Sequence, residues 1–110
     1  MTEYRVHISE SAARQIEEHV AHIQRASGSL RTGWNWADWL YKRFETLSYQ
    51  PERYEFAPEQ TYVDYEVRRL NTGNYLATYF VVAERLEVHI LSFRHGSRLP
   101  RSTDLPPNPP

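Results

Sequence analysis

The chain has 110 residues, a formal net charge of −1 and no cysteine. Its length suits one domain, and the lack of cysteine excludes a disulfide framework, a thiol nucleophile and a cysteine-ligated zinc. No apolar run approaches the roughly 20 residues that span a bilayer, and no N-terminal segment has the plan of a signal peptide. We therefore expect a cytoplasmic protein that does not contact a membrane.

Charge is distributed unevenly along the chain. Residues 9–60 hold 6 basic and 8 acidic side chains, whereas residues 65–101 hold 6 arginines and only three glutamates. A protein that works on nucleic acid usually carries a basic field, because neutralised phosphates supply most of the non-specific affinity. Direct nucleic-acid binding is therefore not expected, and the second half of the chain is the better candidate for facing an anion.

The first half predicts one strand and two helices. Apolar and polar residues alternate over residues 3–8, which indicates a half-buried strand. Ser9 suits the N-cap of a helix over residues 10–26 that ends at Gly28. A second helix is predicted over residues 34–49, before a proline. The short linker predicts an antiparallel helical hairpin.

The second half predicts three strands and a tail. The strands cover residues 65–70, 75–83 and 86–94. The order β-α-α-β-β-β implies an α+β fold in which a small antiparallel sheet packs on the N-terminal helical hairpin. Residues 99–110 contain five prolines and are expected to form an extended, flexible tail, which leaves residues 1–98 as the single domain.

The last two predicted strands are apolar on both faces, and this points to a protein partner. Alternation places Val88 and Ile90 on one face and Leu91 and Phe93 on the other. Two helices cover only one face of a small sheet, so either another chain or the irregular segment 51–64 covers the second. We favour another chain, because large apolar patches usually mark interfaces.

Surface aromatic residues on the second helix point the same way. Three of them lie outside the helix's apolar stripe: Trp34, Trp39 and Tyr41. Such residues are enriched in protein interfaces. Stacking on nucleic-acid bases is the alternative, but the sequence offers these rings no surplus of basic neighbours.

The last strand ends in Arg94, His95 and Arg98, which form a candidate anion-facing edge. Guanidinium groups suit phosphate or carboxylate, and an imidazole exchanges protons near neutral pH. The edge has three interpretations: ion pairs with local carboxylates, contact with a partner protein, or catalysis. Arg68 and Arg69 are adjacent on an earlier strand and face opposite sides, so at most one of them joins this edge.

Two histidines on the first helix raise the question of a metal site. His19 and His22 lie three residues apart, a spacing that can hold a metal ion. The sequence provides no evident third ligand. We therefore expect ordinary surface histidines, no metal and no cofactor.

The order of elements and several motifs resemble the RelE/ParE superfamily of toxins from bacterial type II toxin–antitoxin modules, often called plasmid stabilisation proteins. The resemblance covers residues 3–98. Its most specific pieces are Tyr65-Glu-Val-Arg-Arg-Leu-Asn-Thr-Gly-Asn-Tyr75 and Arg94-His-Gly-Ser-Arg98. It implies a RelE/ParE-like fold and a cognate antitoxin that wraps the toxin in a hetero-oligomer.

The resemblance implies one of two activities. RelE-like members cleave mRNA on the ribosome with basic residues on the sheet and often a C-terminal tyrosine, whereas ParE-like members inhibit DNA gyrase. Here Leu76 stands where RelE-like enzymes carry an arginine, and the tail has no tyrosine. We therefore expect a ParE-like gyrase inhibitor rather than a catalyst. Its candidate contacts with target or antitoxin are Trp34, Trp39, Tyr41, Arg68, Arg69, Arg94, His95 and Arg98. The alternatives are a RelE-like ribosome-dependent mRNA endoribonuclease that uses Arg69, His95 and Arg98, and a non-toxic binding homologue.

Overall fold

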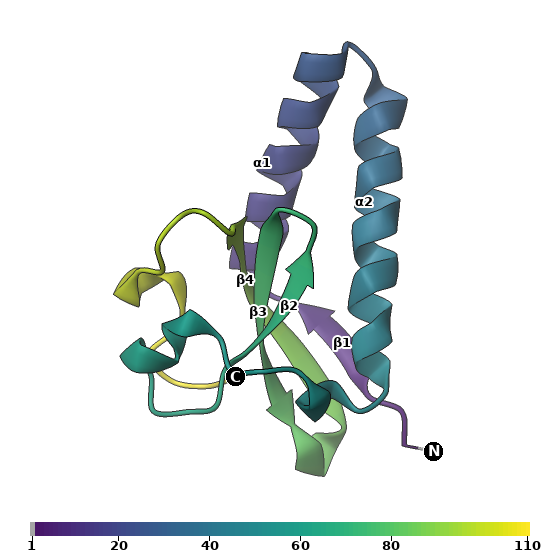
Figure 1. Cartoon of the computed structure of the whole chain (residues 1–110). Coiled ribbons are helices and arrows are strands. Elements are labelled where there is room, and N and C mark those ends of the chain that lie inside the picture. The colour runs from purple at the N-terminus through teal and green to yellow at the C-terminus, as the bar shows by residue number, and fades with distance from the viewer. Residues whose placement is uncertain (1) are drawn as a thin grey trace.

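The computed structural model describes residues 2–110, in which two helices pack on one face of a four-stranded sheet. The main elements are β1 (Arg5–Ile8), α1 (Glu10–Ser27), α2 (Leu30–Glu45), β2 (Arg68–Thr72), β3 (Tyr75–Val82) and β4 (Glu87–His95). Figure 1 shows the helices side by side, with the tip of their hairpin projecting beyond the sheet. The α+β fold and the predicted order of elements are confirmed. No described helix is both long and apolar enough to cross a membrane.

The sheet is mixed rather than antiparallel throughout. Its strand order is β1-β4-β3-β2, and β3 runs antiparallel to both of its neighbours. The edge strand β1 runs parallel to β4. The prediction of a wholly antiparallel sheet assumed that neighbouring strands are joined by hairpins. The connection out of β1 passes through both helices instead, so no tight turn sets its direction.

Local capping signals set the ends of the helices. The Ser9 hydroxyl accepts a hydrogen bond from the Ala12 amide at 3.1 Å, and Gly28 closes α1 with φ +70°. Ser29 caps α2 in the same way, so this helix begins four residues before the predicted start. Gly33 is buried where the helices meet, since an added Cβ would lie 2.5 Å from a side-chain carbon of Gln24. The predicted start of α2 at residue 34 places Gly33 in the linker instead.

The main core lies between the helices and the sheet. It buries apolar side chains of α1, α2 and three strands, among them Ile16, Leu40, Phe44, Leu70, Tyr79, Val88, Ile90 and Phe93. A β-bulge lies between β3 and β4, because Thr78 pairs with Ser92 while Tyr79 pairs with Ile90. The skipped residue, Leu91, reverses the alternation. Phe93 therefore shares the helix-facing side with Ile90, and the prediction that it lies with Leu91 is wrong.

The second face of the sheet is covered by the chain itself. A smaller apolar cluster joins the sheet to the irregular segment and the tail: Ala57, Val67, Leu91 and Leu105, with Val63, Tyr65 and Phe80 around it. Leu105 is only 6% exposed, and the Tyr65 hydroxyl donates to the Pro106 carbonyl at 2.6 Å. The expectation that another chain covers this face is therefore wrong, and part of the predicted flexible tail is packed against the domain. Composition gave no sign of either contact.

Candidate functional site

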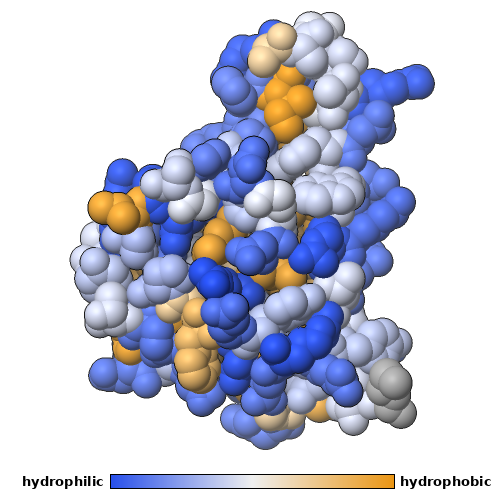
Figure 2. All heavy atoms as spheres, in the orientation of Figure 1, coloured by the Kyte–Doolittle hydropathy of each residue, from blue (hydrophilic) through white to orange (hydrophobic). Residues whose placement is uncertain are grey.

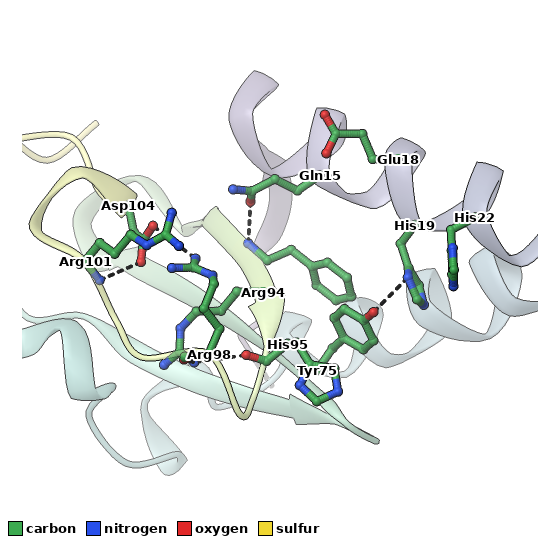
Figure 3. A pocket seen from close by; sticks show the side chains of 11 residues that line it. Gln15, Glu18, His19, His22, Tyr75, Arg94, His95, Arg98, Arg101 and Asp104 are labelled. Carbon is green, nitrogen blue, oxygen red and sulfur yellow. Dashed lines mark hydrogen bonds and ion pairs between the residues drawn. The ribbon is translucent and has the colours of Figure 1, made fainter.

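An open cavity of about 450 Å³ lies between α1, the adjacent ends of β3 and β4, and the tail (Figure 3). Its lining includes all three residues of the predicted anion-facing edge. The lining residues are Gln15, Glu18, His19, His22, Tyr75, Phe93, Arg94, His95, Arg98, Arg101 and Asp104. We call this cavity the histidine pocket.

His95 reaches the pocket from the end of β4, as the sequence predicts. Its Nδ1 accepts hydrogen bonds from the Ser97 amide at 3.1 Å and from the Ser97 hydroxyl at 2.6 Å. Because a backbone amide can only donate, the neutral ring carries its proton on Nε2. The side chain is exposed and lines the pocket.

His19 and His22 join His95 in the pocket, and sequence reasoning missed this. His19 Nδ1 lies 2.8 Å from the Tyr75 hydroxyl, and its ring centroid lies 6.0 Å from that of His22. Burial lowers the pKa of His19, and the charges of His22 and His95 lower it further. The only signal in the sequence was that both residues lie at the edge of the apolar face of α1. Among residues 2–110, no group of three or more His, Asp or Glu side chains is arranged to hold a metal ion.

Arg94 is a buried structural residue. Its side chain is 3% exposed and its guanidinium donates to both carboxylate oxygens of Glu59, at 2.7 and 3.3 Å. It also donates to the carbonyls of His95 and Arg98, at 3.2 and 2.6 Å. The interpretation as an ion pair with a local carboxylate is therefore correct for Arg94, which is removed from the candidate contact residues.

Two further arginines approach the pocket from the tail side. Arg98 donates to Asp104 at 3.1 Å and to the Leu99 carbonyl at 3.1 Å, while its side chain stays 29% exposed. Arg101 is exposed. Arg101 is therefore the exposed guanidinium of a pocket whose lining also holds the Arg98–Asp104 pair, Glu18 and the three histidines.

Arg68 and Arg69 lie away from the histidine pocket. Arg68 donates to the Tyr54 carbonyl at 2.6 Å and lies over the Phe56 ring, opposite Tyr79 on β3. Arg69 pairs with Glu55 at 2.9 Å. Of the alternative catalytic set, His95 and Arg98 therefore share a cavity, whereas Arg69 does not line it.

The three predicted surface aromatics are exposed but do not form one patch. Trp34 and Tyr41 are 61% and 40% exposed and lie within about 20° of each other around α2, at 100° per residue. Trp39, 42% exposed, lies on another side of the helix. It lines a second cavity of about 570 Å³ that shares His19, Tyr75 and His95 with the histidine pocket. In the view of Figure 2 the surface is mainly hydrophilic, and hydrophobic residues show as separate small areas, one of them near the tip of the helical hairpin.

Solved structures with the same fold include two complexes, RelBE2 and RelE–RelB, and one free toxin, RelE. The chain is 22% identical to a chain of the RelBE2 toxin–antitoxin complex of Mycobacterium tuberculosis, with a TM-score of 0.56, over 86% of this chain and 93% of that chain. It is 20% identical to a chain of the archaeal RelE–RelB complex of Pyrococcus horikoshii, with a TM-score of 0.54, over 90% and 100%. It is 15% identical to a mutant of the Escherichia coli toxin RelE in the free state, with a TM-score of 0.52, over 86% and 85%. At these identities the likeness establishes the fold alone.

Sequence comparison establishes the family. No curated protein sequence matches the chain. A family model does match, and it describes the ParE toxin of the type II toxin–antitoxin system parDE, over residues 6–100. The resemblance to the RelE/ParE superfamily is thereby confirmed across nearly the whole sheet and helical hairpin. The chain belongs to the ParE toxin family of type II toxin–antitoxin systems.

Proposed function

We propose that this toxin inhibits DNA gyrase and that a cognate antitoxin neutralises it. The observation that carries the choice of gyrase over the ribosome is that sheet arginines are already paired, Arg69 with Glu55 and the buried Arg94 with Glu59. Cleavage of RNA needs a cation that is free to stabilise the charge on the phosphate. The sheet arginine at the end of β4 instead neutralises a carboxylate inside the protein.

The other sheet positions support the same choice. Arg69 is paired with Glu55, and Arg68 is bound to a carbonyl and an aromatic ring. Leu76, where RelE-like enzymes carry an arginine, is 5% exposed. A sheet whose arginines are already paired suits a protein that acts by binding. Because gyrase works on the bacterial chromosome, the proposal also places the toxin in the bacterial cytoplasm.

The antitoxin contact is proposed for the exposed side of α2. Leu30 and Trp34 are 60% and 61% exposed, and Tyr41 continues the same side of the helix. Tyr41 also lines a groove of about 170 Å³ beside β1, together with Val6 and Ile8. A helical or extended antitoxin segment with apolar residues at matching spacing would bury this row. The product would be a toxin–antitoxin hetero-oligomer.

The test is a supercoiling assay with purified gyrase and relaxed plasmid, run beside a ribosome-dependent mRNA cleavage assay. We expect the full chain to block supercoiling, the antitoxin to restore it, and the mRNA to remain intact. Cleavage that is lost in His95→Ala but kept in His89→Ala, a histidine of the same strand outside the pocket, would instead establish an endoribonuclease.

A ribosome-dependent endoribonuclease remains the second candidate, because of one specific observation. The histidine pocket holds His95, His19 and Arg98 together, so an acid, a base and a cation lie around one cavity. Induced expression separates both candidates from a non-toxic homologue. Filamentation with DNA damage indicates gyrase, rapid arrest of translation indicates the ribosome, and normal growth indicates the homologue.

A further inference from the structure

The histidine pocket and the cavity beside it have different linings and a common wall. The wall consists of His19, Tyr75 and His95. On one side lie the cationic groups of the tail, and on the other side lie aromatic rings of α2 (Figure 3 shows the cationic side). A ligand that extends across this wall would meet cations at one end and aromatic rings at the other.

The cationic side is built to donate hydrogen bonds. The Ser97 amide fixes the His95 tautomer so that Nε2–H is its free donor. The Tyr75 hydroxyl lies 2.8 Å from His19 Nδ1, so a second imidazole of the pocket is held in place by a hydrogen bond. Arg101 adds an exposed guanidinium. Several donors around one cavity of about 450 Å³ suit a phosphate group.

The aromatic side is built to hold a flat apolar group. Trp39 and Trp36 line it with Ile23, and the β2–β3 turn at Gly73 forms its floor. Trp39 is 42% exposed, so part of its ring is available for stacking. Nucleic-acid bases stack on aromatic side chains whatever their sequence. The fold places His19 of α1 and His95 of β4 in the same cavity as Trp39.

We propose that these joined cavities bind a nucleotide, with its phosphate in the histidine pocket and its base against Trp39. The shared chemistry is a phosphate joined through a sugar to a planar base, from a free mononucleotide or from one unit of a single strand. An acidic peptide would use the cations but not the aromatic rings, so it explains only half of the site. Neither cavity includes the Leu30–Trp34 surface proposed for the antitoxin, so nucleotide binding and antitoxin binding can be tested separately.

Calorimetric titration of the full chain tests the proposal with AMP, adenosine, inorganic phosphate, an adenine tetranucleotide and a glutamate-rich peptide. We expect AMP or the tetranucleotide to bind more tightly than adenosine, phosphate or the peptide. Tetranucleotide affinity at least about tenfold above that of AMP identifies a unit of a single strand as the ligand, and a smaller difference identifies a free nucleotide. The proposal is overturned if neither AMP nor the tetranucleotide binds saturably, or if adenosine binds as tightly as AMP. Displacement of bound AMP by the peptide also overturns it.

Variants locate the two halves of the site. Trp39→Ala removes the stacking ring and is expected to weaken AMP binding about tenfold. Arg101→Ala removes a charged donor and is expected to weaken it about tenfold as well. The matched controls are Tyr62→Ala and Arg31→Ala, exposed residues outside both cavities, which should bind AMP as the unchanged protein does. Equal affinity in all four variants places the nucleotide elsewhere and overturns the assignment.

Imidazole spectra of the unchanged chain give a readout that needs no variant. In ¹H–¹⁵N spectra we expect AMP to shift the resonances of His19 and His95. Those of His7 and His89, which stack on each other on β1 and β4 outside both cavities, should stay in place. Shifts confined to His7 and His89 would contradict the site.

Discussion

Replacing Glu59 by glutamine should cost the domain a large part of its stability. The Glu59 side chain is fully buried and that of Arg94 is 3% exposed, so the variant leaves a charged guanidinium inside the protein without its counter-charge. Removing one partner of a buried pair costs about 3–5 kcal/mol. We expect about 3 kcal/mol, since the glutamine oxygen still accepts one hydrogen bond and Arg94 keeps two carbonyl partners.

Urea unfolding of the full chain measures this change through the midpoint at constant slope. A loss of about 3 kcal/mol corresponds to a fall in Tm of roughly 12 °C in a domain of this size. The matched control is Asp38→Asn in the exposed i,i+4 pair with Lys42, which should cost less than about 0.5 kcal/mol. Replacing the buried pair by Glu59→Leu with Arg94→Met should recover much of the loss, because no buried charge then remains. A Glu59→Gln protein as stable as the Asp38→Asn protein would refute the reasoning.

Three further predictions concern the tail, the pocket and α2. Leu105→Ala should lower the free energy of unfolding by about 2 kcal/mol and speed tryptic cleavage at Arg101. Leu99→Ala, at a side chain 80% exposed, should change neither. Equal cleavage rates in the two variants would mean that the tail is not packed against the domain. The pKa of His19 is lowered in the folded protein, so the unfolded chain binds this proton more readily. The free energy of unfolding should therefore fall as pH drops below about 6.5. Urea titrations at pH 7.5 and 5.5 should show a smaller fall for His19→Gln. Unchanged pH dependence in His19→Gln would contradict this. Trp34→Ala should weaken antitoxin binding by about 2 kcal/mol in calorimetry, with Tyr62→Ala as control, and equal affinities would move the interface off α2.

Local signals in the sequence predicted the local structure well. Ser9 and Gly28 fixed the ends of α1 because capping depends on residues within one turn of the helix. Ser29 carries the same kind of signal, but the predicted start of α2 at residue 34 leaves it in the linker. The order of elements, and with it the fold class, followed from hydrophobic periodicity and turn residues.

Features that depend on contacts between distant residues were not predictable in this way. Nothing in the residues around Leu91 announces the bulge, because a bulge is a property of the pair of strands. Closure of the second face by Ala57 and Leu105 has no periodic signature. The histidine pocket exists only because α1 crosses the ends of β3 and β4, so the sequence could supply His95 and Arg98 but not their neighbour His19.

The pairing of β1 with β4 has a consequence for how this toxin is made. Arg5 pairs with Glu87, so the first strand of the chain has no partner until the last strand has been synthesised. Until then the apolar face of the helical hairpin has no complete sheet to cover it. Long-range pairing of this kind slows folding and prolongs the exposure of apolar surface. A ribosome that is translating this message therefore carries a domain that cannot complete its sheet until the last strand has been made.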